Sequence, residues 1–200
     1  MRKILIIGAG RSASSLIRYL LNKSEIEKLH ITIADLSVEL AQKKTQNHAN
    51  ATAIALDIFN TEQRQTEIQK ADIVISMLPA NLHIEVAKDC LSFNKSMVTA
   101  SYISPQMEAL NDEAVRKGLV FMNEVGLDPG IDHMSAMKVI DEIKDQGGKI
   151  ILFESFCGGL VAPESDNNLW NYKFTWAPRN EDLAGQSGTA KFIQERKNKY

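Results

Sequence analysis

The chain has 200 residues, of which 44% are hydrophobic and 24% are charged, as is typical of a globular protein. A net charge of −2 and the lack of any apolar stretch near the ~20 residues of a membrane span argue against nucleic acid or a membrane as a partner. Two cysteines, Cys90 and Cys157, and a start without a signal peptide lead us to expect a cytoplasmic protein.

The first apolar run leads directly into a glycine-rich turn. Residues 3–7 (KILII) predict a strand covered on both faces. Gly8 would allow a tight turn, Gly10 would leave room for a pyrophosphate, and Ala13 would let the next helix pack closely. An ordinary strand-to-helix turn is the alternative. The whole motif has the G-x-G-x-x-G/A pattern of a dinucleotide-binding site and consists of Gly8, Ala9, Gly10, Arg11, Ser12 and Ala13.

A carboxylate follows the second expected strand. After an amphipathic helix, residues 30–34 form an apolar strand run that ends at Asp35, 22 residues after Ala13. An acid at this distance would bind the 2′-hydroxyl of a ribose. It would also repel a 2′-phosphate, and residues 36–38 supply no cation, so NAD is favoured as cofactor. NADP is not excluded, because Arg11 could reach toward the phosphates.

Strand and helix patterns alternate up to residue 125. This alternation predicts an α/β fold, a Rossmann-type doubly wound parallel sheet that occupies residues 1–125. Thr61 is a candidate helix cap, and Pro105 fits the first turn of a helix. Further strands are expected at residues 51–56, 72–78, 96–100 and 119–122, and helices at residues 38–47, 61–69, 82–91 and 105–116.

Residues 126–200 have a different pattern, which predicts the start of a second, incomplete α/β substrate domain. A strand with all its aromatic side chains on one face, as expected for residues 170–176, needs a cover. Pairing of two chains into a homodimer through this unit would supply one. The expected elements are a helix at 131–146, strands at 149–156 and 170–176, and a loop followed by a short helix at 182–191.

The ends of the later strands offer further cofactor contacts, because a nucleotide lies at the carboxyl edge of such a sheet. Asp57 would lie near the adenine, with a simple turn cap as the alternative. The segment from Ser76 to Leu78 would pass the ribose and pyrophosphate, with a plain strand end as the alternative. The candidates at these ends are Asp57, Ile58, Ser76, Leu78, Ala100 and Ser101.

Two later motifs contain groups that suit acid–base chemistry. Residues 126–133 read GLDPGIDH and residues 155–160 read SFCGGL. The segment around Asp128 could also be a turn, Asp132 a helix cap and His133 a first-turn residue. Cys157 could be an inert small hydrophobe or a proton donor with a perturbed pKa.

Together these motifs closely resemble the saccharopine dehydrogenase family. The resemblance covers residues 3–180 and includes one small departure, Val161, where the family typically has Pro. Members of the family are considerably longer, so the resemblance implies a cofactor half and the opening of a substrate half. Basic residues that hold the carboxylates of the substrate would then lie beyond Tyr200. The matching stretches are residues 99–105 (TASYISP), 122–133 (MNEVGLDPGIDH), 155–164 (SFCGGLVAPE), 168–169 and 172–176.

The resemblance implies an NAD(P)-dependent dehydrogenase of lysine metabolism. The secondary amine of saccharopine would give a hydride to the nicotinamide, and hydrolysis of the imine would yield glutamate and α-aminoadipate semialdehyde. By motif, Asp128 and Cys157 match the acid–base groups of the family, and Tyr102 matches an orienting hydroxyl. Ser101 and Tyr102 would face the substrate, and no metal is expected. The nicotinamide pocket would be lined by Leu127, Asp128 and Pro129.

Two other functions remain open. A carboxynorspermidine or homospermidine synthase-like enzyme also handles amine and imine chemistry. A nucleotide-binding module without turnover would fit a chain that lacks the basic substrate residues.

Overall fold

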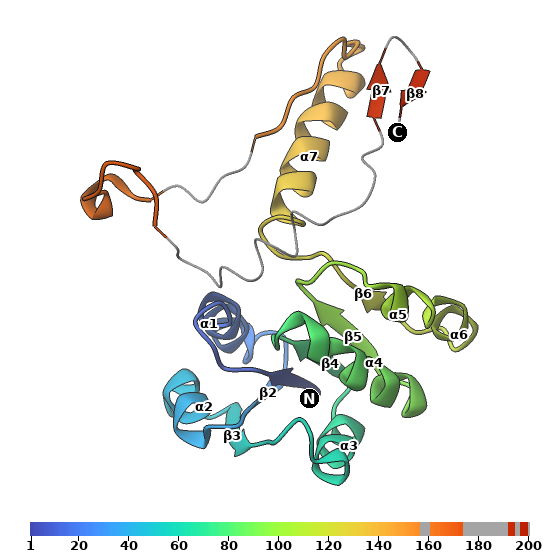
Figure 1. The fold of residues 1–200 in the computed structure, drawn as a ribbon. Helices are drawn as coiled ribbons and strands as arrows, with labels where there is room; N and C mark the ends of the chain where they lie inside the picture. Colours follow the sequence, from blue (N-terminus) through green and yellow to red (C-terminus); the bar gives the residue numbers. More distant parts are fainter. Residues whose placement is uncertain (157–160, 174–191, 195–196, 200) are drawn as a thin grey trace. The chain divides into compact units, whose positions relative to one another are not determined.

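The computed structural model describes residues 1–156, 161–173, 192–194 and 197–199. The chain divides into two compact units, Met1–Ile151 and Leu152–Tyr200. The first unit contains the six-stranded sheet and the helices around it (Figure 1).

The first unit is built on a six-stranded parallel sheet with the order β3-β2-β1-β4-β5-β6. The chain moves outward from β1 in one direction and then returns to add β4 on its other side. This arrangement confirms the expected Rossmann-type doubly wound sheet and places its switch point between β1 and β4. The strands are β1 (Arg2–Ile7), β2 (Leu29–Asp35), β3 (Ala51–Ala55), β4 (Ile73–Ser76), β5 (Ser96–Thr99) and β6 (Phe121–Met122).

Helices cover both faces of this sheet (Figure 1). The helices α1 and α2 share a core with one face, and α3, α4 and α5 share a core with the other. They are α1 (Ser14–Lys23), α2 (Val38–Thr45), α3 (Thr61–Lys70), α4 (His83–Ser92), α5 (Pro105–Glu108), α6 (Asn111–Arg116) and α7 (Ile131–Asp145), with a 3-10 turn η1 (Ala80–Leu82) before α4.

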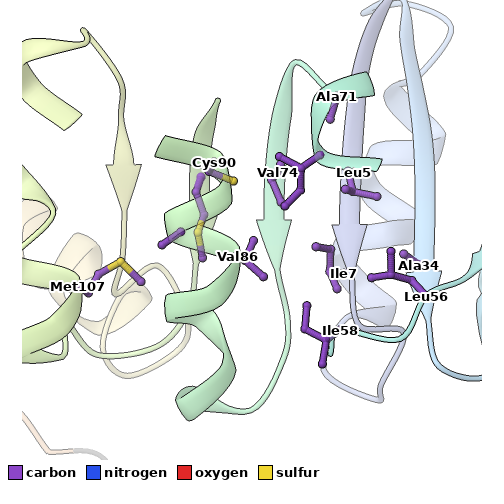
Figure 2. Packing of buried hydrophobic residues seen from close by; sticks show 13 residues of the cluster. Leu5, Ile7, Ala34, Leu56, Ile58, Ala71, Val74, Val86, Cys90 and Met107 are labelled. Atoms are coloured by element: carbon purple, nitrogen blue, oxygen red, sulfur yellow. The ribbon is translucent and has the colours of Figure 1, made fainter. Parts of the chain in front are cut away.

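The alternation of side chains along β1 explains the two cores. Successive residues of a strand point to opposite faces. Ile4 and Ile6 therefore join the core beneath α1 and α2, whereas Leu5 and Ile7 join the core beneath α3 and α4. Figure 2 shows this second core, in which Val86 of α4 lies close to the strands of the sheet. A strand that buries both faces explains why the first run of the sequence is apolar.

Two of the expected helix details are wrong. Asn60, and not Thr61, caps α3, because its side-chain oxygen accepts the backbone N–H of Gln63. The single helix expected at residues 105–116 is two helices, α5 and α6. Between them, the N–H of Leu110 bonds to the residue three positions back, Met107, which tightens the turn and interrupts the regular helix.

The expected strand at residues 149–156 is also wrong. This segment has no strand structure, and within the described part of the chain no strand pairs with it. A strand needs a partner for its backbone groups, which an apolar sequence alone does not supply. Of the expected strand at 170–176, Trp170 lies in a turn and residues 171–173 form no strand, while residues 174–176 lie outside the described residues. The expected helix at 182–191 also lies outside them.

The described part of the second unit contains few elements. They are a 3-10 turn η2 (Pro163–Ser165) and two short strands, β7 (Phe192–Gln194) and β8 (Lys197–Lys199), which pair in antiparallel fashion. No helix among the described residues has the length and apolar character needed to cross a membrane.

A buried ion pair connects α3 to α4. The Nε of Arg64 donates to Asp89, and both residues are only 5% exposed. The guanidinium also donates to the carbonyl of Ile58, and Gln65 donates to the second oxygen of Asp89 at 2.9 Å. A buried charge that loses its partner is strongly destabilising.

We expect Asp89→Asn to lower the free energy of unfolding by about 3–5 kcal/mol, because it leaves the Arg64 charge buried without a counter-charge. Glu85→Gln is the control on the same helix. It removes an exposed pair with Lys88 and should cost about 1 kcal/mol or less. Urea unfolding of the two variants measures both values. If both variants lost the same free energy of unfolding, the stabilising role of the buried Arg64–Asp89 pair would be contradicted.

Candidate nucleotide-binding site

The glycine turn after β1 is forced by the neighbouring strand end. Gly8 has a φ of +107°, and a Cβ on it would lie 2.7 Å from the backbone oxygen of Met77, just after β4. The N–H of Gly8 donates to Ala34 at 2.7 Å, and the N–H of Met77 donates to Ile7 at 2.8 Å. Any side chain at position 8 would therefore clash with backbone, which explains the first glycine of the motif.

The next part of the turn is open. A Cβ on Gly10 would meet no atom within 4 Å. The backbone N–H groups of Gly10, Arg11 and Ser12 donate to no acceptor in the described part of the chain. Ala13 is fully buried beneath the start of α1. Unpartnered N–H groups at an open helix start suit the negative charge of a pyrophosphate, so these residues fit a dinucleotide.

Asp35 at the end of β2 is bound to this turn. Its Oδ2 accepts the backbone N–H of Ala9 at 2.7 Å, and its Oδ1 accepts that of Ser37 at 3.0 Å. Each carboxylate oxygen has a further lone pair, so Asp35 can still accept a hydroxyl. The structure thus places Asp35, the residue expected to bind the ribose, beside the glycine turn.

Three other expected cofactor residues lie at the same edge with their side chains in structural roles. Asp57 is exposed and accepts the N–H of Phe59 at 2.9 Å, which is the turn-cap alternative. The side chain of Ile58 is buried in the core, and Leu78 packs against the same core. Contacts of these three residues with a nucleotide stay predictions.

A histidine that the sequence patterns did not single out connects the ends of β4 and β5. His83, the first residue of α4, is 4% exposed. Its Nδ1 lies 2.8 Å from Ser76 Oγ, and its Nε2 lies 2.7 Å from Ser101 Oγ. Ser76 and Ser101 were both expected at the site, and His83 joins them directly. The contact depends on the pairing of β4 with β5, so the only local signal was a histidine shortly after a strand end.

Burial keeps this histidine neutral, because desolvation lowers the pKa of His83 to about 4. A neutral imidazole has one donor and one acceptor nitrogen. When Nε2–H donates to Ser101, the Ser76 hydroxyl donates to Nδ1, and the Ser101 hydroxyl proton is free for a ligand. His83 therefore sets the direction of both serine hydroxyls.

The loop after β6 lies beside the segment after β5. The N–H of Glu124 donates to the carbonyl of Ser101 at 3.1 Å, and its carboxylate accepts the N–H of Ile103 at 3.1 Å. A Cβ on Gly126 would lie 3.1 Å from the Cβ of Ala100. These contacts place residues 100–103 beside residues 124–126, which directly precede the expected site residues 127–129.

Within residues 100–102 and 127–129, the side chains differ in exposure. Tyr102 is 61% exposed and Leu127 is 71% exposed, and Asp128 is also on the surface, whereas Pro129 is buried. Exposed groups at a strand end are free to meet a ligand. The catalytic and binding roles of all four stay predictions, and Cys157 lies outside the described residues.

Asp132 connects this loop to α7 from the first turn of the helix. The N-cap of α7 is Gly130, so the cap alternative for Asp132 is wrong, whereas His133 lies in the first turn as expected. Its Oδ1 accepts the N–H of Gly130 at 2.8 Å, and its Oδ2 lies 2.8 Å from Nδ1 of His133. The hydrogen bond to Asp132 raises the pKa of His133, and the negative charges of Asp128 and Glu124 act in the same direction. The described residues contain no group of three or more His, Cys, Asp or Glu side chains arranged to hold a metal ion.

The glycine turn after β1, Asp35 at the end of β2 and the connected ends of β4 and β5 define a Rossmann-type nucleotide-binding domain. Comparison with protein families identifies it further. Residues 4–122 match the model "Saccharopine dehydrogenase NADP binding domain", and residues 126–200 match "Saccharopine dehydrogenase C-terminal domain". The chain belongs to the saccharopine dehydrogenase family.

Individual relatives agree with this assignment. A saccharopine dehydrogenase [NADP(+), L-glutamate-forming] of Schizosaccharomyces pombe is 38% identical over 98% of this chain and 43% of the fungal protein. An alpha-aminoadipic semialdehyde synthase of Arabidopsis thaliana is 34% identical over 92% of this chain and 19% of the plant protein. The apo structure of the L-Glu-forming saccharopine dehydrogenase from Saccharomyces cerevisiae has a TM-score of 0.81 and 36% identity, covering 100% of this chain and 44% of that one. This chain therefore spans less than half the length of the fungal relatives.

The comparisons confirm that the cofactor site is one for a nicotinamide dinucleotide. They favour NADP, which is named in the family model and in the fungal relatives, over NAD, the form favoured by Asp35 alone.

The pH dependence of stability tests the neutral state of His83. An unfolded histidine gains a proton below about pH 6.5, whereas folded His83 does so only near pH 4. The wild type should therefore lose stability, relative to His83→Asn, as pH falls from 6.5 to 4, by at most about 1.4 kcal/mol per pH unit.

Urea unfolding at pH 7.5, 6 and 5 measures this difference. His133→Asn is the control with the opposite sign: because Asp132 raises the pKa of His133, the advantage of the wild type over this variant should grow as pH falls. A difference between wild type and His83→Asn that is constant with pH would contradict a buried neutral histidine.

Proposed function

We propose that this chain is the cofactor-binding part of a saccharopine dehydrogenase. The reaction is hydride transfer between the secondary amine of saccharopine and NADP, with glutamate and α-aminoadipate semialdehyde as the products. Family membership supports the reaction, and one observation carries the binding: the open turn at Gly10 with the unpartnered N–H groups of Arg11 and Ser12.

The cofactor would be held along the carboxyl edge of the sheet. Backbone N–H groups of Gly10, Arg11 and Ser12 take the pyrophosphate, and Asp35 accepts a ribose hydroxyl. The bound nicotinamide supplies the acceptor or donor of the hydride. Ala100, Leu127 and Pro129 line the nicotinamide end, which is supported by the close approach of the neighbouring Gly126 to Ala100 after β5.

The residues beyond β5 and β6 supply the acid–base and orienting groups. The carboxylate of Asp128 accepts the proton of the amine, returns it to the imine nitrogen, and then accepts a proton from the attacking water, so it acts as both base and acid. Tyr102 orients the substrate through its hydroxyl, and Cys157 serves as a second proton-transfer group. Ser101 forms a hydrogen bond with the substrate through its hydroxyl, and His83 holds that hydroxyl in place at 2.7 Å from its Nε2.

Three further expectations belong to this proposal. The division into a cofactor domain (1–125) and the beginning of a substrate domain (126–200) is supported by the boundaries of the two family models, although the compact unit extends to Ile151. Pairing of two chains through the second unit is supported by the exposed side chains of Leu169 and Trp170. A cytoplasmic location is supported by the cysteine content, whereas some relatives are named as mitochondrial.

Two glycine substitutions test the nucleotide site. Gly10→Ala places a methyl group in open space, so the fold should keep its stability. The methyl group would crowd a pyrophosphate and should raise the Kd for NADPH about 10-fold or more. Fluorescence titration with NADPH measures the Kd, and urea unfolding measures the stability.

Gly8→Ala is the matched variant. Because of the positive φ and the contact with Met77, it should lower the free energy of unfolding by at least about 1 kcal/mol. If Gly10→Ala binds NADPH as tightly as the wild type does, the glycine turn is not the pyrophosphate site. If the wild type does not bind NADPH, the proposed function of this chain is wrong.

A further inference from the structure

A cationic hollow lies between α1 and α2, next to the glycine turn. It has a volume of about 260 Å³. Half of its lining residues are positively charged, and the hollow adjoins the turn because Ser14 is the first residue of α1. The lining consists of Ser14 and Arg18 from α1 and Leu40, Lys43, Lys44 and Gln46 from α2 and the residue after it.

These cations have no acidic partner among the residues that the structure describes. None of the ion pairs in the described part of the chain includes Arg18, Lys43 or Lys44. Like charges that gather at one place on neighbouring helices repel each other and reduce stability. Such a cluster is relieved by an anion, for which Arg and Lys are the usual partners.

One of the three cations is fixed to the cofactor turn. The half-buried Lys44 donates through Nζ to Ser14 Oγ, and Ser14 Oγ donates to the backbone oxygen of Arg11 at 2.8 Å. Two hydrogen bonds thus connect the ammonium group to the segment whose free N–H groups fit a pyrophosphate. The adenosine half of a nucleotide is expected near this segment, since Asp35 binds the N–H of Ala9 in the same turn.

The segment after β2 contains no cation that could bind a 2′-phosphate, whereas the hollow contains three. In many NADP sites an arginine close to the acidic position binds the 2′-phosphate. Here Asp35 is an acid and residues 36–38 are Leu, Ser and Val. A chain of an NADP-binding family with this sequence needs another source of positive charge, and α1 and α2 provide one.

We propose that the hollow between α1 and α2 binds the 2′-phosphate of NADP, with Lys44 and Arg18 as its main partners and Lys43 as an additional charge. The inference rests on the proposed nucleotide-binding function. It makes the helices, and not the loop after β2, the determinant of the preference for NADP over NAD in this chain.

Titration of the 200-residue chain with NADPH and with NADH tests the proposal. The wild type should bind NADPH more tightly. The double variant Arg18→Met/Lys44→Met should lose this preference: its Kd for NADPH rises about 10-fold or more, the effect of losing a charge-assisted hydrogen bond, and by a larger factor than its Kd for NADH. If the double variant does not fold, Lys44→Arg is measured in its place. This variant keeps the positive charge and should retain the preference for NADPH.

Lys23→Met is the matched control, because Lys23 is an exposed cation on α1 outside the hollow. It should leave both Kd values unchanged. An unchanged ratio of the two Kd values in Arg18→Met/Lys44→Met, or a wild type that prefers NADH, would overturn the proposal while leaving a nicotinamide site intact. Failure of both nucleotides to bind would instead refute the proposed function.

Smaller probes distinguish a nucleotide phosphate from a free anion. Adenosine 2′,5′-bisphosphate should compete with NADPH at least about 10-fold better than AMP, and the double variant should abolish this advantage. Inorganic phosphate should weaken NADPH binding more than NADH binding. Phosphate that binds at the hollow without competing with NADPH would show a separate anion site and would overturn the proposal.

Discussion

The close approach of Gly8 to the backbone of Met77 is the constraint on which the nucleotide-binding edge depends. Because β1 and β4 pair in parallel, their carboxyl ends lie side by side, and only a residue without a Cβ fits between them. The turn then leads into α1 with its N–H groups free. Asp35 holds the turn from the side of β2, and the link from Ser76 through His83 to Ser101 continues the edge to β5.

Much of the fold was predictable from the sequence because one physical rule dominates it. Strands that are buried on both faces must be apolar throughout, so the runs of β1 and β4 stood out against the amphipathic helices between them. The same rule gave a wrong strand prediction at residues 149–156, where an apolar run has no partner strand among the described residues. Apolar character indicates burial, but a strand also requires a neighbour, which only the tertiary structure supplies.

The site was predictable where function constrains the local backbone. Gly8, Gly10 and Asp35 belong to a motif whose spacing reflects the geometry of a turn, and the structure places them as expected. His83 was missed because its role arises from contacts between two strand ends. The cations of the hollow belong to two helices that are separated in sequence, so no local pattern joins them.

The central claim is that the backbone of the glycine turn binds the pyrophosphate of NADP. Amide hydrogen exchange by NMR, with and without saturating NADPH, tests it at single residues. The N–H groups of Gly10, Arg11 and Ser12 have no protein acceptor in the described structure, so they should exchange rapidly in the free chain and at least about 10-fold more slowly with NADPH bound. Unchanged exchange at these residues, while NADPH is bound, would contradict the account.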